Sequence, residues 1–316
     1  MPVDSLYTRR IMLKSASDGV LGLGIDAGGT QTRWALADPA GAVVAEGRVE
    51  GLSALQLSSA AGRESVRAAF AALAAEVLEI GRPGRVCAGL TGFGGDSHLP
   101  AGWLADLLAL PAESVSLCND IEIAYLDCFD PGQGYLVYAG TGSIAAFIDE
   151  AGAFHRAGGR GVVLDDGGGG FWIAREAMRR IWRREDEQPG AWQDSPLAQA
   201  VFRHVGGSDW TFSRQFIYGL ERGEVGKLAL AVAASADADA AARNILQQAG
   251  RELARLALAL VARFGERPVL LSGRASELHP LIAESMRAAL PEDQVFEHRP
   301  VRPHVAAARM AARPRN

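Results

Sequence analysis

The chain repeats one stretch of its own sequence, and this repeat restricts the possible folds more than any other feature. When the sequence is shifted by 111 positions, residues 28–47 (GGTQTRWALADPAGAVVAEG) align without a gap with residues 139–158 (AGTGSIAAFIDEAGAFHRAG), and eight positions are identical. The match keeps a Gly/Thr turn, an apolar strand and the next glycine-containing turn in register. Two copies of so long a unit indicate two related domains, because a solenoid needs at least three short repeats.

Each copy has the pattern of a small mixed sheet. Apolar strands over 20–26 and 134–140 end in the Gly/Thr turns, and two further short strands follow each turn. Helices and strands alternate after that, with helices at 225–234 and 276–289 among those expected in the second half. We therefore predict an α/β fold with a mixed sheet in each domain, helices on both faces and a cleft between the two domains.

The expected domain boundaries follow from the repeat. We predict a disordered leader over 1–18, a first domain over 19–130 plus 303–316, and a second domain over 131–302. Hinges are expected near 128–134 and 298–304, where the chain passes between the domains.

Composition limits the class of partner. The 316 residues carry a formal net charge of −5, which argues against nucleic acid because such binding depends on neutralising phosphates. No apolar run approaches the length of a membrane span. The three cysteines, Cys87, Cys118 and Cys128, match no zinc or iron–sulfur spacing and are too few for a disulfide framework, so we expect a cytoplasmic protein.

The repeated turns have the residues of a phosphate site. A single Gly/Thr turn is ordinary for a hairpin, whereas two turns facing one cleft can hold a polyphosphate through backbone N–H groups. Glycine allows the backbone to approach oxygen atoms closely. Hydroxyl groups of Thr30, Thr141 and Ser143 can add further hydrogen bonds.

Five segments resemble, in the right order, those of the N-acetylglucosamine kinases. They match the two phosphate loops, the first connecting segment, the sugar loop and the adenosine loop of that family: GIDAGGTQT, CNDIEIAYL, YAGTGSIAAFI, GGRGVVLDDGGGGFWIAREA and LSGRAS. The family is grouped with the bacterial glucosamine kinases and the activator ATPases of benzoyl-CoA reductase type. The resemblance covers about residues 20–312. It implies two duplicated ribonuclease-H-like domains of the actin/hexokinase ATPase fold, a kinase that uses ATP and Mg²⁺, an amino sugar as substrate and a homodimer.

The resemblance also implies roles for individual residues. Asp26 would orient Mg²⁺ through water, and Asp120 would be the catalytic base that accepts the proton of the sugar hydroxyl. Read from the residues alone, Asp120 could equally be a helix N-cap. The residues implied for ATP are Gly28, Gly29, Thr30, Gly140, Thr141, Val225, Gly273 and Arg274, and those implied for the sugar are Asp120, Ser143, Gly159, Gly161 and Asp166.

Three positions depart from the family pattern. Leu55 and Ile144 stand where an asparagine can contact the sugar, and Gly167 stands where an acidic residue occurs in mammalian-like members. The resemblance implies phosphorylation of N-acetylglucosamine at its C-6 hydroxyl, and these departures leave glucosamine or another amino sugar as the alternative.

Two proteins of another class stay open as alternatives. An activator ATPase for a reductase would need cysteines in the second domain to hold an iron–sulfur cluster, and all three cysteines precede residue 129. A sugar sensor without catalytic activity would have no need of Asp120 or of both phosphate turns.

Overall fold

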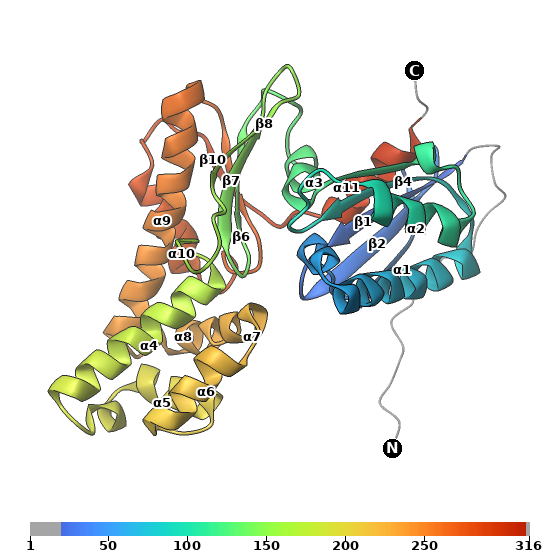
Figure 1. The fold of residues 1–316 in the computed structure, drawn as a ribbon. Helices are drawn as coiled ribbons and strands as arrows, with labels where there is room; N and C mark the ends of the chain where they lie inside the picture. Colours follow the sequence, from blue (N-terminus) through green and yellow to red (C-terminus); the bar gives the residue numbers. More distant parts are fainter. Residues whose placement is uncertain (1–19, 314–316) are drawn as a thin grey trace. The chain divides into compact units, whose positions relative to one another are not determined.

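The computed structural model describes residues 20–313, so the leader expected over 1–18 lies outside the described residues. The described chain forms two compact units (Figure 1). Unit 1 contains residues up to Cys128 and those from Arg302 onward, and unit 2 contains Phe129–Val301. The chain therefore passes from one unit to the other twice, and each unit is described by itself below.

A five-stranded sheet forms the centre of unit 1. Its strand order is β3-β2-β1-β4-β5, with β1, β2 and β3 antiparallel and β1, β4 and β5 parallel. The strands are β1 (Leu21–Ala27), β2 (Gln31–Ala37), β3 (Val43–Glu50), β4 (Pro83–Leu90) and β5 (Val115–Asn119). Because β1, β4 and β5 are parallel, the residues that follow them gather at one edge of the sheet.

Helices cover both faces of this sheet. The larger core packs α1 (Ala60–Ile80) and α2 (His98–Leu108) against one face, and α3 (Asp120–Leu126) and α11 (Pro303–Ala312) cover the other (Figure 1). Gly24 of β1 allows the closest approach, because an added Cβ would lie 2.0 Å from the carbonyl oxygen of His304 in α11. Two short 3₁₀ helices, η1 (Ala54–Ser58) and η2 (Ala112–Ser114), complete the unit.

Unit 2 repeats the topology of unit 1. Its strand order, β10-β9-β6-β7-β8, has the same antiparallel and parallel pairings as the first sheet. The strands are β6 (Tyr135–Ala139), β7 (Ser143–Ile148), β8 (Phe154–Gly158), β9 (Val269–Ser272) and β10 (Phe296–His298). The predicted duplication and the predicted fold class are thus confirmed.

The two repeated hairpins differ by one residue in their turns. Ala27 pairs with Thr32 in unit 1, whereas Ala139 pairs with Ser143 in unit 2. The second turn is therefore one residue shorter, and the ungapped match holds from the turn onward but not for the strand before it.

Unit 2 carries most of the helices. Long helix α9 (Ala240–Phe264) packs on the sheet, and α10 (Pro280–Ala289) packs on α9. The others follow β8, with a 3₁₀ helix η3 (Ala191–Asp194) among them: α4 (Gly170–Glu187), α5 (Pro196–Val205), α6 (Trp210–Gly219), α7 (Arg222–Gly226) and α8 (Ala229–Ser235). In the part of the chain that the structure describes, no helix is both long and apolar enough to cross a bilayer.

Two helix predictions were wrong in detail. The helix expected over 225–234 is two helices, because α7 ends at Gly226 and α8 begins at Ala229. The helix expected over 276–289 begins later, at Pro280, where the His279 side chain accepts the Leu281 N–H and proline occupies the first position.

Candidate functional site

The first Gly/Thr turn joins β1 to β2 at the carboxyl end of β1. Its Gly28 N–H donates to the Gln31 carbonyl oxygen (3.2 Å). Among the described residues, nothing accepts a hydrogen bond from the N–H groups of Gly29 and Thr30. A Cβ on Gly29 would meet no atom within 4 Å, so the turn is open on that side. Free N–H groups beside open space are the requirement for an anion cradle.

The following segment supports this turn. Leu52 N–H donates to the Gly28 carbonyl oxygen (3.1 Å). A Cβ on Gly51 would lie 2.4 Å from the carbonyl carbon of Thr30, so only glycine fits there without moving the backbone. The turn is thus fixed by contacts at its back and keeps its open side.

Asp120 is the first residue of α3, directly after β5. The N-cap is its neighbour Asn119, whose side chain accepts the Ile121 N–H (3.0 Å) and whose own N–H donates to Glu122 (3.2 Å). Capping of α3 is therefore achieved by a complete capping box around Asn119. Of the two residues that could cap this helix, the structure assigns the cap to Asn119.

The pKa of the Asp120 carboxyl group is higher than that of an ordinary aspartate. Burial raises the pKa of Asp120 to about 6, and hydrogen bonds from the Thr91 side chain and the Ile121 N–H act in the opposite direction. The group is still mostly ionised at neutral pH, but it binds a proton far more readily than an exposed aspartate. Such a pKa suits a general base.

The second Gly/Thr turn, in unit 2, is fastened to the start of α4. Gly140 N–H donates to the Gly142 carbonyl oxygen (2.9 Å), and the carbonyl oxygens of Gly140 and Thr141 accept the N–H groups of Gly170 (2.9 Å) and Phe171 (3.0 Å). The positive end of the α4 dipole therefore lies at the turn, where it favours an anion. Within residues 20–313, the N–H groups of Thr141 and Gly142 have no acceptor.

Asp166 lies against the second turn. It is buried and has φ +55°, an uncommon conformation for a residue other than glycine. Its Oδ1 accepts the Gly161 N–H (3.1 Å), and an added Cβ on Gly142 would lie 2.2 Å from its Oδ2. Burial raises the pKa of Asp166, and the Gly161 N–H lowers it. Gly159 and Gly161 also have positive φ, which fits the tight path of this loop.

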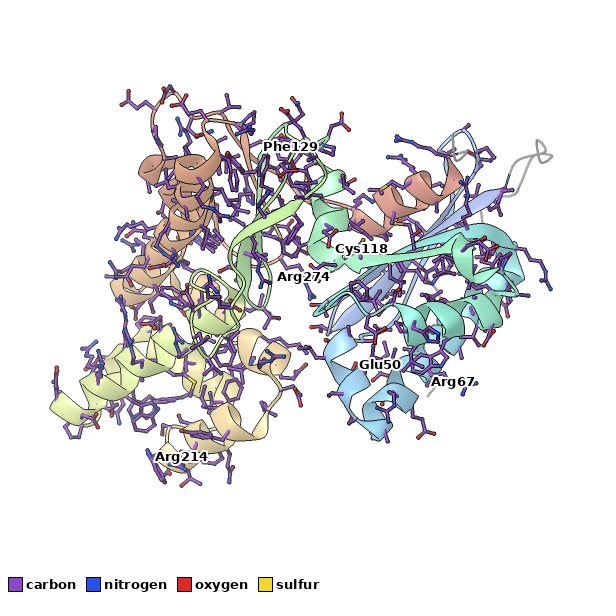
Figure 2. The ribbon with its side chains drawn as sticks, turned by 45° about the horizontal axis from the view of Figure 1, so that its top comes forward. Glu50, Arg67, Cys118, Phe129, Arg214 and Arg274 are labelled. Carbon is purple, nitrogen blue, oxygen red and sulfur yellow. The ribbon has the colours of Figure 1, made fainter. Side chains whose placement is uncertain are left out.

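The remaining unit 2 residues expected at the site lie in different surroundings. Ser143 is buried and its hydroxyl donates to the Gly167 carbonyl oxygen (2.6 Å), so it fastens the loop around Asp166. The Val225 side chain is fully buried, which leaves no part of it exposed to a ligand. Gly273 (φ +99°) touches the end of β6, and the exposed Arg274 follows it, as labelled in Figure 2.

Each unit therefore gathers its expected residues at one sheet edge. In unit 1 these are Asp26, the first turn and Asp120, and in unit 2 the second turn, Asp166 and Gly273. Gly51 and Thr91 were not among the residues expected at the site. The available signal for Thr91 was its place directly after the buried strand β4, where parallel strands end together.

No metal cage is formed by the described residues, because no group of three or more histidine, cysteine or acidic side chains comes together. The half-buried Asp26 at the end of β1 is a single carboxylate beside the first turn. One carboxylate fits Mg²⁺, which keeps several of its waters and is otherwise held by the phosphates of a nucleotide.

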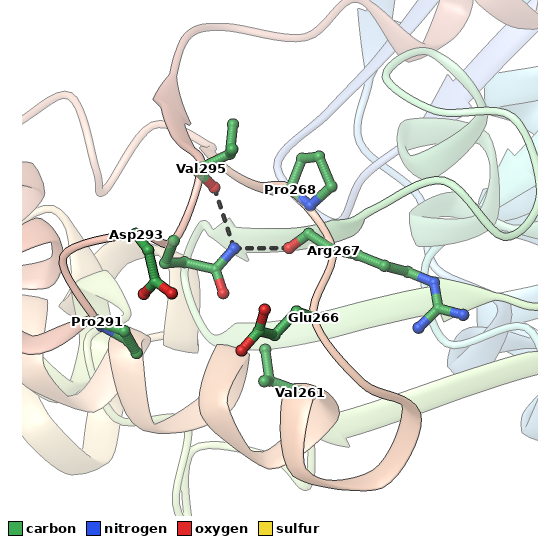
Figure 3. Close-up of a pocket in the computed structure, with 8 residues that line it drawn as sticks. Val261, Glu266, Arg267, Pro268, Pro291, Asp293 and Val295 are labelled. Carbon is green, nitrogen blue, oxygen red and sulfur yellow. Dashed lines mark hydrogen bonds between the residues drawn. The ribbon is translucent and has the colours of Figure 1, made fainter.

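A separate cavity of about 220 Å³ lies at the opposite, amino end of β9 (Figure 3). The Gln294 amide closes part of it by donating to the carbonyl oxygens of Arg267 (2.6 Å) and Val295 (3.2 Å). Glu266 and Asp293 also line it, and none of the expected site residues does.

Comparisons with known proteins agree with this fold. The N-acetyl-D-glucosamine kinase of Dictyostelium discoideum is 31% identical over 110 residues, which are 33% of each protein, so the similarity spans about a third of that relative. A crystal structure from Chromobacterium violaceum, described as a candidate N-acetylglucosamine kinase, has a TM-score of 0.70 and 24% identity and covers 92% of this chain and 99% of its own. A ROK family glucokinase from Streptomyces griseus, solved with glucose and AMPPNP, has a TM-score of 0.61 and 18% identity, with 92% and 98% covered.

These structural similarities, at under 25% identity, show the fold of sugar kinases of the actin/hexokinase type. The sequence model of one protein family matches residues 23–308, which are nearly the whole described chain. The protein therefore belongs to the BadF/BadG/BcrA/BcrD ATPase family.

Proposed function

We propose that the protein is an ATP-dependent amino-sugar kinase that phosphorylates N-acetylglucosamine at its C-6 hydroxyl. The proposal depends most on the position and pKa of the Asp120 carboxyl group. This group lies at the same edge of the sheet as the first Gly/Thr turn, and burial raises its pKa to about 6. A base at the edge that also carries an anion cradle is what phosphoryl transfer to an alcohol requires.

Each turn by itself offers donors for phosphate oxygens of ATP. Within the described residues, the N–H groups of Gly29 and Thr30 in unit 1 and of Thr141 in unit 2 have no protein acceptor. These groups can donate to phosphate oxygens, and the start of α4 adds the positive end of a helix dipole. In this proposal Gly273 and Arg274 contact the adenosine. Asp26 would hold Mg²⁺ through water, and the ion would supply positive charge beside the phosphates.

Asp120 would act as the general base. Its carboxylate accepts the proton of the C-6 hydroxyl while that oxygen forms a bond to the γ-phosphorus. The bond from the γ-phosphorus to the bridging oxygen breaks, and ADP leaves with the electron pair. Base catalysis of this kind contributes about 10²–10⁴-fold, and positioning of the reactants and charge neutralisation supply much of the remaining acceleration.

The sugar contacts of the proposal lie in the loop around Asp166. The buried carboxylate would accept hydrogen bonds from sugar hydroxyls, and its place against Gly142 puts it beside the second turn. Backbone groups of Gly159 and Gly161 would add further contacts. Ser143 supports this loop through Gly167, so its part in sugar binding is indirect.

Glucosamine is the alternative substrate. Leu55, with 58% of its surface exposed, stands where an amide could contact the sugar, and Ile144 packs under Gly159, where an added Cβ would lie 2.6 Å from its Cδ1. Neither side chain can hydrogen-bond an acetamido group. A homodimer is proposed only on the resemblance to the kinases.

A coupled ADP-release assay tests the proposal. Wild type and Asp120→Asn are compared on N-acetylglucosamine, glucosamine, glucose and no sugar, with ATP binding measured for both proteins. We expect sugar-dependent ADP release by wild type and a loss of about 10²–10⁴-fold in turnover for the variant with unchanged ATP affinity.

Three results would contradict the proposal. ADP release that is independent of every sugar would favour an activator ATPase. Sugar binding without turnover would favour a sensor. Full turnover by Asp120→Asn would show that Asp120 is not the general base.

A further inference from the structure

Thr91 lies beside Asp120 because of the register of two parallel strands. Leu90, the last residue of β4, pairs with Asn119, the last residue of β5, so the next residue in each chain segment is Thr91 and Asp120. The start of α3 can approach β4 closely because Gly89 of β4 has no side chain. An added Cβ on Gly89 would lie 2.9 Å from the Asp120 Cα. The two residues are therefore held side by side by the sheet.

The backbone of Thr91 is fixed in both directions. Its N–H donates to the carbonyl oxygen of Ala27, the residue before the first Gly/Thr turn (2.9 Å). Its carbonyl oxygen accepts the Ala54 N–H (2.9 Å) and the Ser53 hydroxyl (3.2 Å). Thr91 thus connects the end of β1 with the segment that leads to Leu55.

The register places the Thr91 side chain next to the Asp120 carboxylate, and as a hydrogen-bond donor it lowers the pKa of that carboxyl group. Within α3, the Ile121 N–H donates to the carboxylate (3.0 Å), and the backbone of Asp120 itself also lowers its pKa. These backbone groups belong to α3 itself, whereas Thr91 directly follows β4. Among the described residues, Thr91 is therefore the partner that relates the direction of the carboxylate to the turn on β1.

We propose that Thr91 is a positioning residue, which holds the Asp120 carboxylate toward the acceptor hydroxyl and in register with the first Gly/Thr turn. This inference rests on the proposed kinase function. It assigns to Thr91 no contact with the sugar or the nucleotide. In this inference Thr91 acts on Asp120 through its side-chain hydroxyl group.

Few ionisable groups surround Asp120. Among the described residues these are Glu122 and Tyr125 on its own helix, Cys118 on β5, Cys87 on the adjacent β4 and Asp26 near the end of β1. On the packed side of α11, Ala307, Met310 and Ala311 belong to the same apolar cluster as Ile123 of α3. Replacing Thr91 therefore removes a hydrogen bond without removing a charge.

Thr91→Val keeps the shape of the side chain and removes the hydroxyl, and Thr91→Ser keeps the hydroxyl. The pKa of Asp120 is measured in each free protein by carbon NMR of labelled aspartate, with Asp120→Asn to assign the signal. For the valine variant we expect the pKa to rise by about 0.5–1 unit. The acid limb of kcat/KM should move up by the same amount and kcat should fall about tenfold, with KM for ATP unchanged and with recovery in the serine variant.

Thr211→Val is the matched control. Asp209, the N-cap of α6, accepts the Thr211 N–H (2.8 Å), and the Thr211 side chain lowers the pKa of this carboxyl group. Both residues are remote in sequence from every residue of the proposed site. This variant should raise the pKa of Asp209 and leave sugar phosphorylation unchanged.

The readouts separate this inference from the proposed function. An Asp120 pKa that is the same in wild type and Thr91→Val would overturn the role of Thr91, even if turnover fell. A raised Asp120 pKa with an unchanged rate and pH profile would show that Asp120 is not the base, and both proposals would fail together. A raised pKa with a slower rate, restored by serine, supports both.

Discussion

The Asp166 carboxylate and Gly142 are in direct contact in unit 2, since a Cβ on Gly142 would lie 2.2 Å from Asp166 Oδ2. The contact joins the loop proposed to bind the sugar to the turn proposed to bind phosphate. It depends on the absence of one side chain.

Gly142→Ala should therefore displace the Asp166 carboxylate. The displaced group would lose the hydrogen bond from Gly161 N–H, which is worth about 0.5–1.5 kcal/mol. We expect kcat/KM for the sugar to fall about three- to tenfold, measured by steady-state kinetics. Gly94→Ala, a site where an added Cβ meets no atom within 4 Å, is the control and should retain wild-type kinetics. A Gly142→Ala enzyme with normal kinetics would contradict a role for this contact.

The pH dependence of the reaction should follow Asp120. Burial raises the pKa of this carboxyl group to about 6, and only the ionised form can accept a proton. In the free enzyme kcat/KM should thus be level near pH 7–8 and should fall about tenfold per unit below about pH 6. A profile of kcat/KM from pH 5 to 8 tests this. An acid limb near pH 4 would indicate an ordinary exposed carboxyl group instead.

The duplicated turns could be predicted because glycine and threonine recur there in register, and the start of α3 could be predicted from Asn119 and Asp120. The junction at Thr91 could not. It depends on which strands are neighbours, and the sequence of β4 alone does not reveal that β5 lies beside it. The same holds for Gly51, whose backbone contact with Thr30 exists only in the folded unit.

The prediction of a helix from local sequence was also wrong where tertiary packing determines the backbone conformation. The segment from Val225 to Ala234 is rich in alanine and leucine, which favour helix, yet the helix is interrupted at Lys227 and Leu228. The interruption lies next to Gly226. This glycine packs near Phe171 at the start of α4 and near Thr141 in the second Gly/Thr turn. Packing against the second turn thus outweighs helix propensity there.

Leu55 should influence the choice of sugar. It is 58% exposed at the segment held by Thr91, and it packs on Gly92, where an added Cβ would lie 2.7 Å from its Cγ. Leu55→Asn supplies an amide that can hydrogen-bond an acetamido group. We expect kcat/KM for N-acetylglucosamine relative to glucosamine to rise about three- to tenfold, the value of one hydrogen bond. Leu99→Asn, also an exposed leucine of unit 1, is the control. An unchanged ratio would show that Leu55 does not face the sugar.

The packing of α11 on β1 should tolerate no side chain at Gly24. An added Cβ would lie 2.0 Å from the His304 carbonyl oxygen and 2.1 Å from the Ala308 nitrogen, and both are backbone atoms that cannot rotate away. Gly24→Ala should therefore separate the helix from the strand and destabilise the protein by more than about 4 kcal/mol, an unusually large value for one methyl group. Gly102→Ala adds the same methyl group inside α2, where it meets nothing within 4 Å, and should instead stabilise by about 0.5–1 kcal/mol. Urea unfolding followed by circular dichroism measures both. Similar midpoints for the two variants would contradict the close contact of β1 with α11.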